Sequence, residues 1–469
     1  MDGLDIEEIY KSNLENSFTI GAEYYGKRFV NAANCVKKIN HKTLQEISDI
    51  ITDGDHGSSN YQQSGVLYLL SESVHQGYID ILKCRYISEE KNKELHRSEL
   101  HPNDIVVTKT GVYFGKSAVI TNKIEKANMI AHVGKISLKN SYNPFFVSTF
   151  LNCKYGYYQL RRRGIKATRP EIKLVEFSDI IIPVFSGVIE HCIEEIINKA
   201  LQLMDFANSI IKQCENDIAL CVAGKNCIVS CNYAIKPFSK TFELTGRLDA
   251  EYYQPKYDRL FSTLSKYTCK PLGGENGLVL FKKSIEPGSE YYQSDGVPFI
   301  RVSDISKFEI EDPEIHLPLD IVDNIEDLYP EKDTILFSKD GSVGIAYKVE
   351  DRMEIITSGA LLHLTIKNQD EILPDYLTLV LNSPIVQLQA ERDTNGAIIQ
   401  HWKPSEIEKV VIPVLDMDKQ IEISDKVKES FALRKKSKQL LEDAKRAVEI
   451  AIEQDEESAI IWLKDRVDL

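Results

Sequence analysis

YYQSDGVPFIRVSDI, Tyr291–Ile305, has a counterpart earlier in the same chain, NYQQSGVLYLLSESV, Asn60–Val74. The two stretches match in the spacing of aromatic, glycine and apolar positions. Four further pairs of segments recur at an offset that stays between 228 and 232 residues: Ala22–Tyr25 with Ala250–Tyr253, Glu99–Gly111 with Asp327–Gly341, Asn143–Asn152 with Leu373–Asn382, and Val175–Val184 with Ser405–Val414. Chance similarity would not keep register across five segments, so the sequence predicts one scaffold present twice.

Each copy follows the same plan along the chain. Short β-branched segments alternate with turns rich in Gly, Asp and Ser, which indicates strands and turns. A short helix is expected around FFVSTFLNCKYGYYQL in the first copy and YLTLVLNSPIVQLQAER in the second. A strand then ends at Pro183 or Pro413, and a long helix closes the copy. This order predicts a mixed α/β fold in each half.

The two closing helices carry apolar residues at alternating spacings of three and four, which is typical of a coiled-coil stripe. In the first helix the stripe is Ile189, Ile193, Ile196, Ala200, Leu203, Ala207, Ile210 and Cys214, and in the second it is Ile423, Val427, Leu441, Ala444, Val448 and Ala451. Ser430, Arg434 and Ser437 interrupt the second stripe. Packing of each helix against its own domain would also explain a stripe. Two such long helices favour pairing with each other.

The bulk composition indicates a soluble globular protein. The chain has 469 residues, of which 43% are hydrophobic and 27% charged, and its net charge is −14. No apolar run reaches membrane-spanning length and no signal peptide is visible. Nine cysteines without C-x2-C zinc spacing suggest free thiols in a reducing compartment, so we expect a cytoplasmic protein.

The segment KTGVYFGKS, Lys109–Ser117, is one residue short of a phosphate-binding loop. That loop needs G-x-x-x-x-G-K-[ST] ahead of a helix. Here β-branched residues that indicate a strand follow the glycines. The second copy reads KDGSVGIAY, Lys339–Tyr347, and lacks the Gly-Lys-Ser altogether. The shared part is therefore predicted to be a strand–turn–strand, and nucleotide binding is not expected.

Three other motifs resemble parts of enzyme sites, and none of them is interpreted as a catalytic or metal site. NPFF, Asn143–Phe146, lacks the second proline of an adenine-methyltransferase motif, and its counterpart is LPDY. PEIK, Pro170–Lys173, resembles half of a nuclease site, but its counterpart QHWK has no carboxylate. DGDH, Asp53–His56, is better interpreted as a polar turn capped by its own side chains than as a metal pair. No catalytic residue, metal site or cofactor site is predicted.

Basic residues gather in Lys154–Lys173, which has seven basic residues and one acidic residue. By contrast, Asp304–Asp333 carries eleven acidic and two basic residues. Arginines contact phosphates and guanine edges in DNA, whereas Asn and Gln suit adenine. A solvated helix end followed by a loop, and plain turn chemistry at Lys109 and Lys339, remain alternatives. The predicted DNA-binding residues are Lys109, Tyr113, Lys116, Arg161, Arg162, Arg163, Lys166, Thr168, Arg169, Arg301, Lys339, Thr394, Asn395, Gln400, His401 and Lys403.

The duplicated plan resembles the specificity subunit of type I restriction–modification systems. The motifs that carry the resemblance are GRLDAEYYQPKY (Gly246–Tyr257), SGVLYLL, DGVPFIRV, DTILFSKDGSVG, and the strands IIPV and VIPV before the long helices. The likeness extends from about Ser17 to Glu457. It implies an N-terminal tail over residues 1–20, target-recognition domains over 21–186 and 233–415, and spacer helices over 187–232 and 416–469 that pair as an antiparallel coiled coil.

The resemblance also implies a function and partners. Each domain would read one half of a bipartite site in double-stranded DNA. Two methyltransferase subunits, which carry S-adenosylmethionine, and a restriction and translocase subunit would be the partners. A 30-residue helix is about 45 Å long, and half-sites one DNA turn apart are roughly 34–36 Å from each other. The helices could therefore set the gap between half-sites.

Other functions remain open. The same scaffold would suit the recognition subunit of another methyltransferase-based defence system, or a stand-alone DNA-binding module. A two-lobed coiled-coil scaffold that joins other proteins is favoured by the acidic balance and opposed by the arginine cluster. Replacement of Arg161–Arg163 by alanine should leave such a scaffold unaffected, whereas a DNA reader should lose affinity and salt dependence.

Overall fold

The computed structural model describes residues 10–11, 20–57, 60–111, 114–164, 170–223, 234–394 and 400–466, with only the backbone described at 220–223. The chain divides into two compact units. One unit comprises Met1–Met204 together with Arg434–Leu469, and the other comprises Asp205–Leu433. Among the described helices, none is both long enough and apolar enough to cross a membrane.

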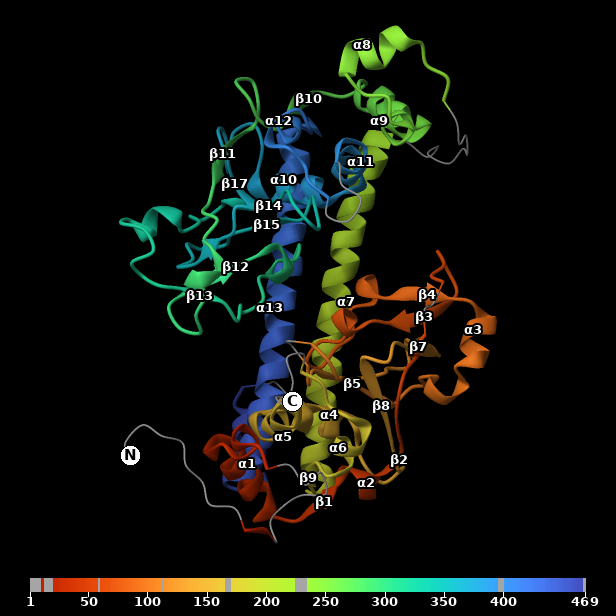
Figure 1. Cartoon of the computed structure of the whole chain (residues 1–469), viewed down its shortest axis with the longest axis vertical. Coiled ribbons are helices and arrows are strands. Elements are labelled where there is room, and N and C mark those ends of the chain that lie inside the picture. Colours follow the sequence, from red (N-terminus) through yellow and green to blue (C-terminus); the bar gives the residue numbers. More distant parts are fainter. Residues whose placement is uncertain are drawn as a thin grey trace. The chain divides into compact units, whose positions relative to one another are not determined.

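The first unit holds three small sheets (Figure 1). A four-stranded antiparallel sheet has the order β2-β8-β5-β6, a three-stranded sheet has the order β4-β3-β7, and β1 pairs with β9. The strands are β1 His41–Thr43, β2 Ser48–Asp53, β3 Val66–Leu69, β4 Arg85–Ile87, β5 Ile105–Thr108, β6 Ser117–Val119, β7 Ala127–Met129, β8 Val133–Leu138 and β9 Ile181–Pro183. In the four-stranded sheet, β5 is buried along its whole length.

The second unit repeats these sheets in the same order. Its four-stranded sheet is β11-β17-β14-β15, its three-stranded sheet is β13-β12-β16, and β10 pairs with β18. The strands are β10 Cys269–Pro271, β11 Val279–Lys283, β12 Val297–Ile300, β13 His316–Leu317, β14 Ile335–Ser338, β15 Ala346–Lys348, β16 Ile356–Thr357, β17 Leu361–Ile366 and β18 Val411–Pro413. The predicted internal repeat and the mixed α/β class are therefore confirmed.

The helices follow the same duplication, with α1, α4, α5, α6 and α7 corresponding to α9, α10, α11, α12 and α13. Their bounds are α1 Lys27–Lys37, α2 Leu44–Ile47, α3 Glu89–Glu94, α4 Pro144–Asn152, α5 Lys154–Gly164, α6 Leu174–Ser178, α7 Gly187–Ala223, α8 Phe242–Thr245, α9 Pro255–Leu264, α10 Pro374–Asn382, α11 Pro384–Asp393, α12 Pro404–Ile407, α13 Met417–Glu453 and α14 Glu456–Lys464. Pro144 and Pro374 occupy the first helical turn, as predicted.

One expectation about the helices was wrong. The single short helix predicted in each half is two helices, α4 and α5 in the first unit and α10 and α11 in the second. The break lies at Cys153 and at Ser383, whose backbones are extended with ψ of 165° and 161°. In the second half, Pro384 explains the break, because proline disfavours a helical conformation in the residue before it.

Two asparagines make the same bonds in the two units. Asn152, at the end of α4, accepts from the N–H of Ser117 at 2.9 Å and donates to its carbonyl at 2.7 Å. Asn382, at the end of α10, accepts from the N–H of Ala346 at 3.1 Å and donates to its carbonyl at 2.8 Å. Each amide thus completes the hydrogen bonding of an edge strand, β6 or β15, and fixes the preceding helix against the sheet.

Two glutamines are equivalent in the same way. Gln159 of α5 exchanges two hydrogen bonds with the backbone of Ile181 in β9, at 3.0 and 2.9 Å. Gln389 of α11 exchanges two with Val411 of β18, at 3.0 and 2.8 Å. Both glutamines are 1% exposed. A buried strand edge without these partners would carry unsatisfied polar groups, so each glutamine ties the second short helix to the strand that leads into the long helix.

The repeated Ala-Glu-Tyr-Tyr motif packs against the second short helix of each unit. In the first unit the guanidinium of Arg162 lies 4.7 Å from the ring centre of Tyr24. In the second unit Arg392 lies 5.0 Å from the ring centre of Tyr252, and Arg247 lies 4.3 Å from the same ring. These cation–π contacts give the motif a structural role in both halves.

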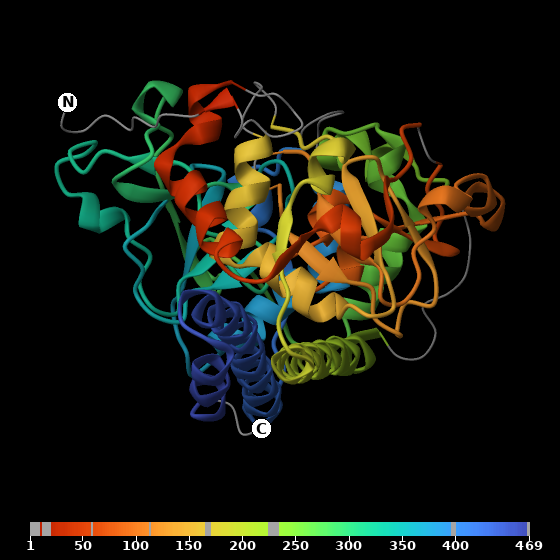
Figure 2. The same ribbon diagram turned by 90° about the horizontal axis from the view of Figure 1, so that it is seen from below.

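α7 and α13 lie side by side in both views (Figures 1 and 2). In the first unit, Ser437 donates to the carbonyl of Ala200 at 2.7 Å, and Arg434 lies 3.3 Å from the sulfur of Met204. In the second unit, Ser430 donates to the carbonyl of Ala207 at 2.8 Å. The paired residue numbers rise on one helix as they fall on the other, which confirms the antiparallel pairing.

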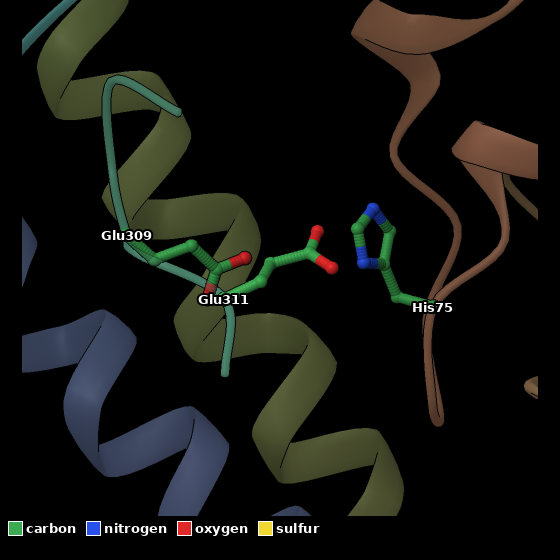
Figure 3. A group of neighbouring side chains, drawn as sticks. All are labelled: His75, Glu309 and Glu311. Atoms are coloured by element: carbon green, nitrogen blue, oxygen red, sulfur yellow. The ribbon is translucent and has the colours of Figure 1, made fainter. Parts of the chain in front are cut away.

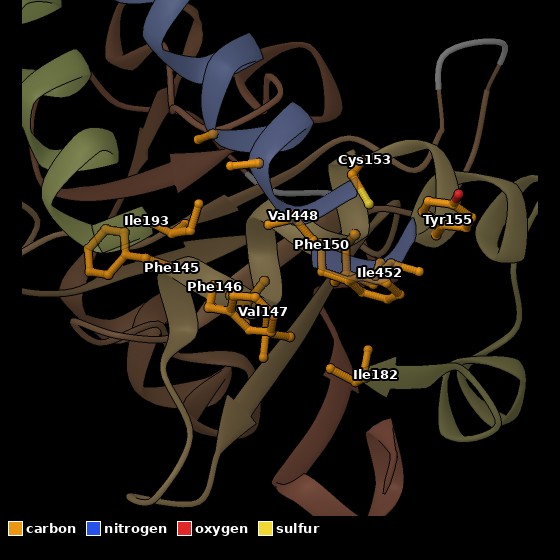
Figure 4. Close-up of a cluster of buried hydrophobic side chains, with 14 of the residues drawn as sticks. Phe145, Phe146, Val147, Phe150, Cys153, Tyr155, Ile182, Ile193, Val448 and Ile452 are labelled. Atoms are coloured by element: carbon orange, nitrogen blue, oxygen red, sulfur yellow. The ribbon is translucent and has the colours of Figure 1, made fainter. Parts of the chain in front are cut away.

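The core of the first unit forms around this helix pair (Figure 4). Phe146 and Phe150 of α4 meet Ile193 of α7 and Val448 of α13, and all four side chains are buried. In the second unit Ile211 of α7 and Val427 of α13 share a core with α10, α11 and the four-stranded sheet. The apolar residues of the two long helices thus belong to the domain cores as well as to the helix pair. Both explanations of the stripes, pairing of the helices and packing against a domain, are therefore correct.

The end of the second long helix differs from the expectation. The first spacer helix was predicted over 187–232; α7 covers Gly187–Ala223, and the rest of the predicted range lies outside the described residues. The second was predicted over 416–469, but α13 ends at Glu453 and a separate helix, α14, follows. The side chain of Asp455 accepts from the N–H of Ser458 at 2.7 Å, which is a helix N-cap and starts the new helix.

Candidate nucleic-acid interface

In the first unit, the turn after β5 is built around a buried ion pair. Lys109, the residue after the strand, is 3% exposed, and its Nζ donates to Oδ2 of Asp53 at 2.7 Å. Asp53 is the last residue of β2, which lies in the same sheet. Burial acts to raise the pKa of Asp53, but the hydrogen bond and charge of Lys109, followed by those of His56, hold this pKa below its ordinary value. Asp53 is therefore a carboxylate.

The same carboxylate also contacts two exposed side chains, a histidine and an arginine. Nε2 of His56 lies 3.2 Å from Oδ2 of Asp53, and Nη2 of Arg97 lies 3.3 Å from Oδ1. The side chains of His56 and Arg97 are 68% and 63% exposed. We call Lys109, Asp53 and His56 the first cluster. Together with Arg97, it presents an oriented imidazole and a guanidinium to the surroundings at the edge of the sheet.

The DGDH motif begins at the last residue of β2, and the side chain of Asp55 caps the chain that follows, in agreement with the predicted capping by its own side chains. Oδ1 of Asp55 accepts from the N–H of Gly57 at 2.9 Å, which closes a turn of the kind that Asp side chains stabilise. Oδ2 of the same residue lies 3.3 Å from Nζ of Lys91. The two aspartates of the motif therefore each have a basic partner within the unit.

A second segment is fastened to the turn of Lys109. The carbonyl of Lys109 accepts from the N–H of Ile172 at 2.9 Å, and the N–H of Gly111 donates to Pro170 at 3.2 Å. Thr110 and Glu171 form an isolated β-bridge. Residues 170–172, which follow α5 after a gap in the described residues, therefore return to the turn after β5.

The three consecutive arginines of α5 point to different surroundings. Arg161 is half-buried, and its guanidinium lies 4.5 Å from the ring centre of Phe114, within the turn that follows β5. Arg162 and Arg163 are 4% and 2% exposed. Arg163 donates to the carbonyl of Gln159 at 2.8 Å and to that of Asp179 at 3.3 Å. Successive helix residues differ by about 100° in direction, so one face of α5 is outward and the next is inward.

The second unit builds an equivalent turn from different residues. Lys339 follows β14 as Lys109 follows β5, and its ammonium donates to Oδ2 of the next residue, Asp340. Oδ1 of Asp340 lies 2.8 Å from Nδ1 of His401, whose side chain is 62% exposed. We call Lys339, Asp340 and His401 the second cluster. A lysine, an aspartate and an exposed histidine thus meet at the repeated turn in both units.

The backbone around the second cluster repeats that of the first. The carbonyl of Lys339 accepts from the N–H of Trp402 at 2.8 Å, and the N–H of Gly341 donates to Gln400 at 2.9 Å. Asp340 and His401 form the isolated β-bridge that Thr110 and Glu171 form in the first unit. Gln400, His401 and Lys403 are exposed here, while Trp402 between them is buried in the core. Three predicted residues therefore lie together beside Lys339.

The remaining predicted residues are placed as follows. Lys116 is half-buried near the end of the same turn as Lys109, and Thr394 follows the last residue of α11. Arg301 lies after β12 in the three-stranded sheet, where its Nε is 3.4 Å from Oδ2 of Asp304. The other predicted residues, Tyr113, Lys166, Thr168, Arg169 and Asn395, fall outside the described residues.

Lys109, Arg162 and Arg163 are buried and bonded within the first unit, so we leave them out of the candidate surface. Arg161, Lys116, Lys339, Thr394, Gln400, His401 and Lys403 stay in it as predictions. Sequence reasoning missed His56, Arg97 and the two aspartates. The signal for them was weak: the repeat aligned Lys109 with Lys339, but Asp53 and Asp340 occupy unrelated positions along the chain.

The phosphate-loop likeness is resolved by the sheet. Thr108 ends β5 and Ser117 begins β6, and the two strands pair antiparallel with Val107 opposite Ser117. The predicted strand–turn–strand is confirmed. Because a strand stands where the helix of a phosphate-binding loop would begin, the turn lacks the helix N-terminus that such a loop uses.

Figure 3 draws His75 with Glu309 and Glu311, a group with the side chains of a metal site. His75 belongs to the first unit, whereas both glutamates belong to the second. The three residues are therefore not a site of either unit, and no metal site is built on them.

Residues 275–443 match the family model described as type I restriction modification DNA specificity domain. Over 147 residues the chain is 27% identical to the type I restriction enzyme EcoBI specificity subunit of Escherichia coli, a match that covers 31% of this chain and 30% of that subunit. The chain thus spans less than a third of the length of this curated relative.

Two solved structures are also similar over most of their length. The HsdS subunit from Thermoanaerobacter tengcongensis is 14% identical, with 89% of this chain and 97% of that chain covered and a TM-score of 0.29. The type I restriction-modification S subunit from M. genitalium is 14% identical, with 90% and 95% covered and a TM-score of 0.32. At scores this low the likeness adds nothing to the fold described above. Residues 275–443, most of the second half, are thus similar to the type I restriction modification DNA specificity domain, the family that the repeated motifs resemble.

Proposed function

We propose that this chain is a non-catalytic DNA sequence-specificity subunit, and that each half reads one half-site of a bipartite site in double-stranded DNA. The observation that carries the proposal is the turn after β5 and after β14. The same backbone bonds hold the turn in both units, while the exposed side chains on it differ. A fixed framework with different exposed donors and acceptors is what two readers of different base sequences require.

The proposed contact surface suits a nucleic acid despite the net charge of −14. In the first unit Arg161 and Arg97 are cationic, and His56 adds a titratable ring. In the second unit the exposed side chains of Gln400 and Lys403 lie on either side of His401 along the chain, at the isolated β-bridge of His401 with Asp340. Phosphate contacts by such cations would position the chain, and polar side chains would reach base edges.

The family points to partners for this function. We propose that methyltransferase subunits, two of them, carry S-adenosylmethionine and methylate adenine, and that a restriction and translocase subunit joins the full complex in the cytoplasm. The chain itself would bind no cofactor. Shared DNA contact with these partners would lessen the repulsion between the acidic chain and the phosphates.

Selection from a pool of random DNA duplexes tests the proposal directly. The full chain, purified with the methyltransferase subunits that accompany it, should enrich two short sequences separated by a fixed gap. Arg161→Ala should weaken binding and reduce its dependence on salt, because each phosphate contact contributes about one ion to that dependence. Enrichment of no sequence, together with an unchanged Arg161→Ala variant, would instead support a scaffold that joins proteins.

A further inference from the structure

We propose that His56 and His401 each read an exocyclic amino group of adenine or cytosine, and that Asp53 and Asp340 are the positioning residues that make them able to do so. The inference rests on the proposed function and names the chemistry of its contacts. It starts from the recurrence of an aspartate and an exposed histidine beside the equivalent lysines, Lys109 and Lys339, of the two units.

The aspartate decides which ring nitrogen carries the proton. An ionised carboxylate can only accept hydrogen bonds, so the nitrogen that faces it must be the donor. That nitrogen is Nε2 in His56 and Nδ1 in His401. In the neutral ring the other nitrogen, Nδ1 of His56 or Nε2 of His401, is then an acceptor. Since both side chains are mostly exposed, this acceptor is the part of the ring that an external ligand can reach.

The lysine of each cluster bonds to the same carboxylate as the histidine. In the first cluster Lys109 and His56 both approach Oδ2 of Asp53, and in the second cluster Lys339 uses Oδ2 of Asp340 while His401 uses Oδ1. An ammonium is a donor without acceptor capacity, so in each cluster the carboxylate is the acceptor in its contact with the lysine.

An outward acceptor selects among the groups that DNA offers. Phosphate oxygens are acceptors and would repel it, whereas the N6 amino group of adenine and the N4 amino group of cytosine are donors in the major groove. Guanine O6 and thymine O4 are acceptors there. The neutral anchored histidine would therefore discriminate adenine and cytosine from guanine and thymine at one position of each half-site.

Asp340→Asn gives the sharpest test, because it should invert the preference. The amide introduced by this substitution would have one carbonyl oxygen, which Lys339 would occupy, and its NH2 would face Nδ1 of His401. That nitrogen would then have to accept, so the proton would move to the outward Nε2. In the random-duplex selection, one position of the second half-site should change from adenine or cytosine to guanine or thymine.

Two variants complete the design. His401→Ala should remove the discrimination at that position, a loss of roughly 10- to 100-fold for one good base contact. Lys339→Met keeps the carboxylate and is the matched control: it should keep the base preference while total affinity falls. The first half-site, which should be unchanged in all three variants, reports that the chain is folded. His56→Ala should in turn alter one position of the first half-site only.

The outcomes are separable. If the unaltered chain enriches no sequence, the proposed function fails. If it enriches two half-sites and both Asp340→Asn and His401→Ala leave the second unchanged, the histidine assignment is overturned while the function stands. If His401→Ala weakens all sequences equally and lowers the salt dependence, His401 contacts a phosphate, and the assignment is overturned as well.

Discussion

The two halves of the chain agree in their framework and differ where the candidate interface lies. Asn152 and Asn382 make the same pair of bonds to an edge strand, although their surroundings differ in sequence. At the turn, by contrast, the lysine takes its aspartate from β2 in the first half and from the next residue in the second. The bonds from these asparagine side chains to the backbone are therefore the same in both halves, whereas the polar groups at the turn differ.

A second pair of equivalent positions shows a difference inside the framework. Gln420 of α13 is fully buried, accepts from the N–H of Leu373 at 3.0 Å and donates to two carbonyls. The equivalent residue of α7, 230 positions earlier, is Glu190. Burial, and then the charge of Glu456, raise the pKa of Glu190 to about 7. The first half therefore carries a carboxyl with a raised pKa where the second carries an amide whose oxygen and nitrogen both have backbone partners.

The largest expected effect comes from breaking the shared framework. Asn152→Ala should lower the free energy of unfolding of the first unit by about 3 kcal/mol, because it leaves the buried N–H of Ser117 unpaired and removes one of the two donors to the carbonyl of this residue. Asn382→Ala should cost less, about 2 kcal/mol, because Asn382 is only half-buried. Hydrogen exchange at Ser117 and Ala346 measures each loss locally. If the amides of Ser117 and Ala346 exchange in the variants as slowly as in the unaltered chain, these bonds do not stabilise the shared framework.

The arginines of α5 separate framework from interface within one helix. Arg163→Ala should destabilise the first unit by about 2 kcal/mol, because two backbone carbonyls lose a charged donor. Arg161→Ala should cost less, about 1 kcal/mol, because it removes a cation–π contact with Phe114 but takes no charged donor from the carbonyls of Gln159 and Asp179. Thermal unfolding of both variants, alongside their DNA affinity, provides the comparison. A large loss of stability for Arg161→Ala would remove it from the interface.

The helix pair offers a smaller effect that should be the same in both units. Ser437→Ala and Ser430→Ala each remove one hydrogen bond between α13 and α7, and each should cost about 1 kcal/mol. Ser437→Leu is the contrasting variant, because a larger side chain at a position where two helices are close should cost more than the alanine. Denaturant unfolding of the three variants checks the order. An alanine variant less stable than the leucine variant would contradict close packing there.

The smallest effect concerns Glu190 and depends on pH. The pKa of Glu190 is raised in the folded chain, so the folded state binds its proton more tightly than the unfolded state. Its contribution to stability therefore falls as the pH rises from the ordinary carboxyl range towards about 7.

Glu190→Gln should accordingly match the unaltered chain near pH 4 and be more stable at pH 8. After allowance for solvent screening of this half-buried group, the gain should be about 1 kcal/mol. The reciprocal change, Gln420→Glu, should destabilise the second unit most at high pH, because it loses two donated bonds and adds a buried charge. Unfolding measured at pH 4 and pH 8 tests both. A pH-independent effect of Glu190→Gln would contradict the raised pKa.

The topology could be predicted from the sequence because the duplication supplied two observations of each element. The strand–turn–strand at Lys109 and the proline-started helices followed from comparison of the two copies. The polar residues of α13 could not be interpreted in this way. Ser430 and Ser437 interrupt the apolar stripe, and only the structure shows that their hydroxyls bond to the facing helix rather than to solvent.

The candidate site was predicted only in outline. Charge density identified the end of α5, but composition does not tell which of three adjacent arginines points inward. The first cluster joins residues from β2 and from the turn after β5, so it depends on sheet order, which a motif search along the chain does not contain. His56 was considered only as part of a turn for this reason.

The central claim is that each half reads its own half-site. The most direct test exchanges Tyr25–Val184 for the same region of a relative and maps adenine methylation in cells that also carry the partner methyltransferase. We predict that methylation follows a bipartite motif and requires this chain. After the exchange, only one half of this motif should change. A change in both halves together, or methylation that does not depend on this chain, would contradict the claim.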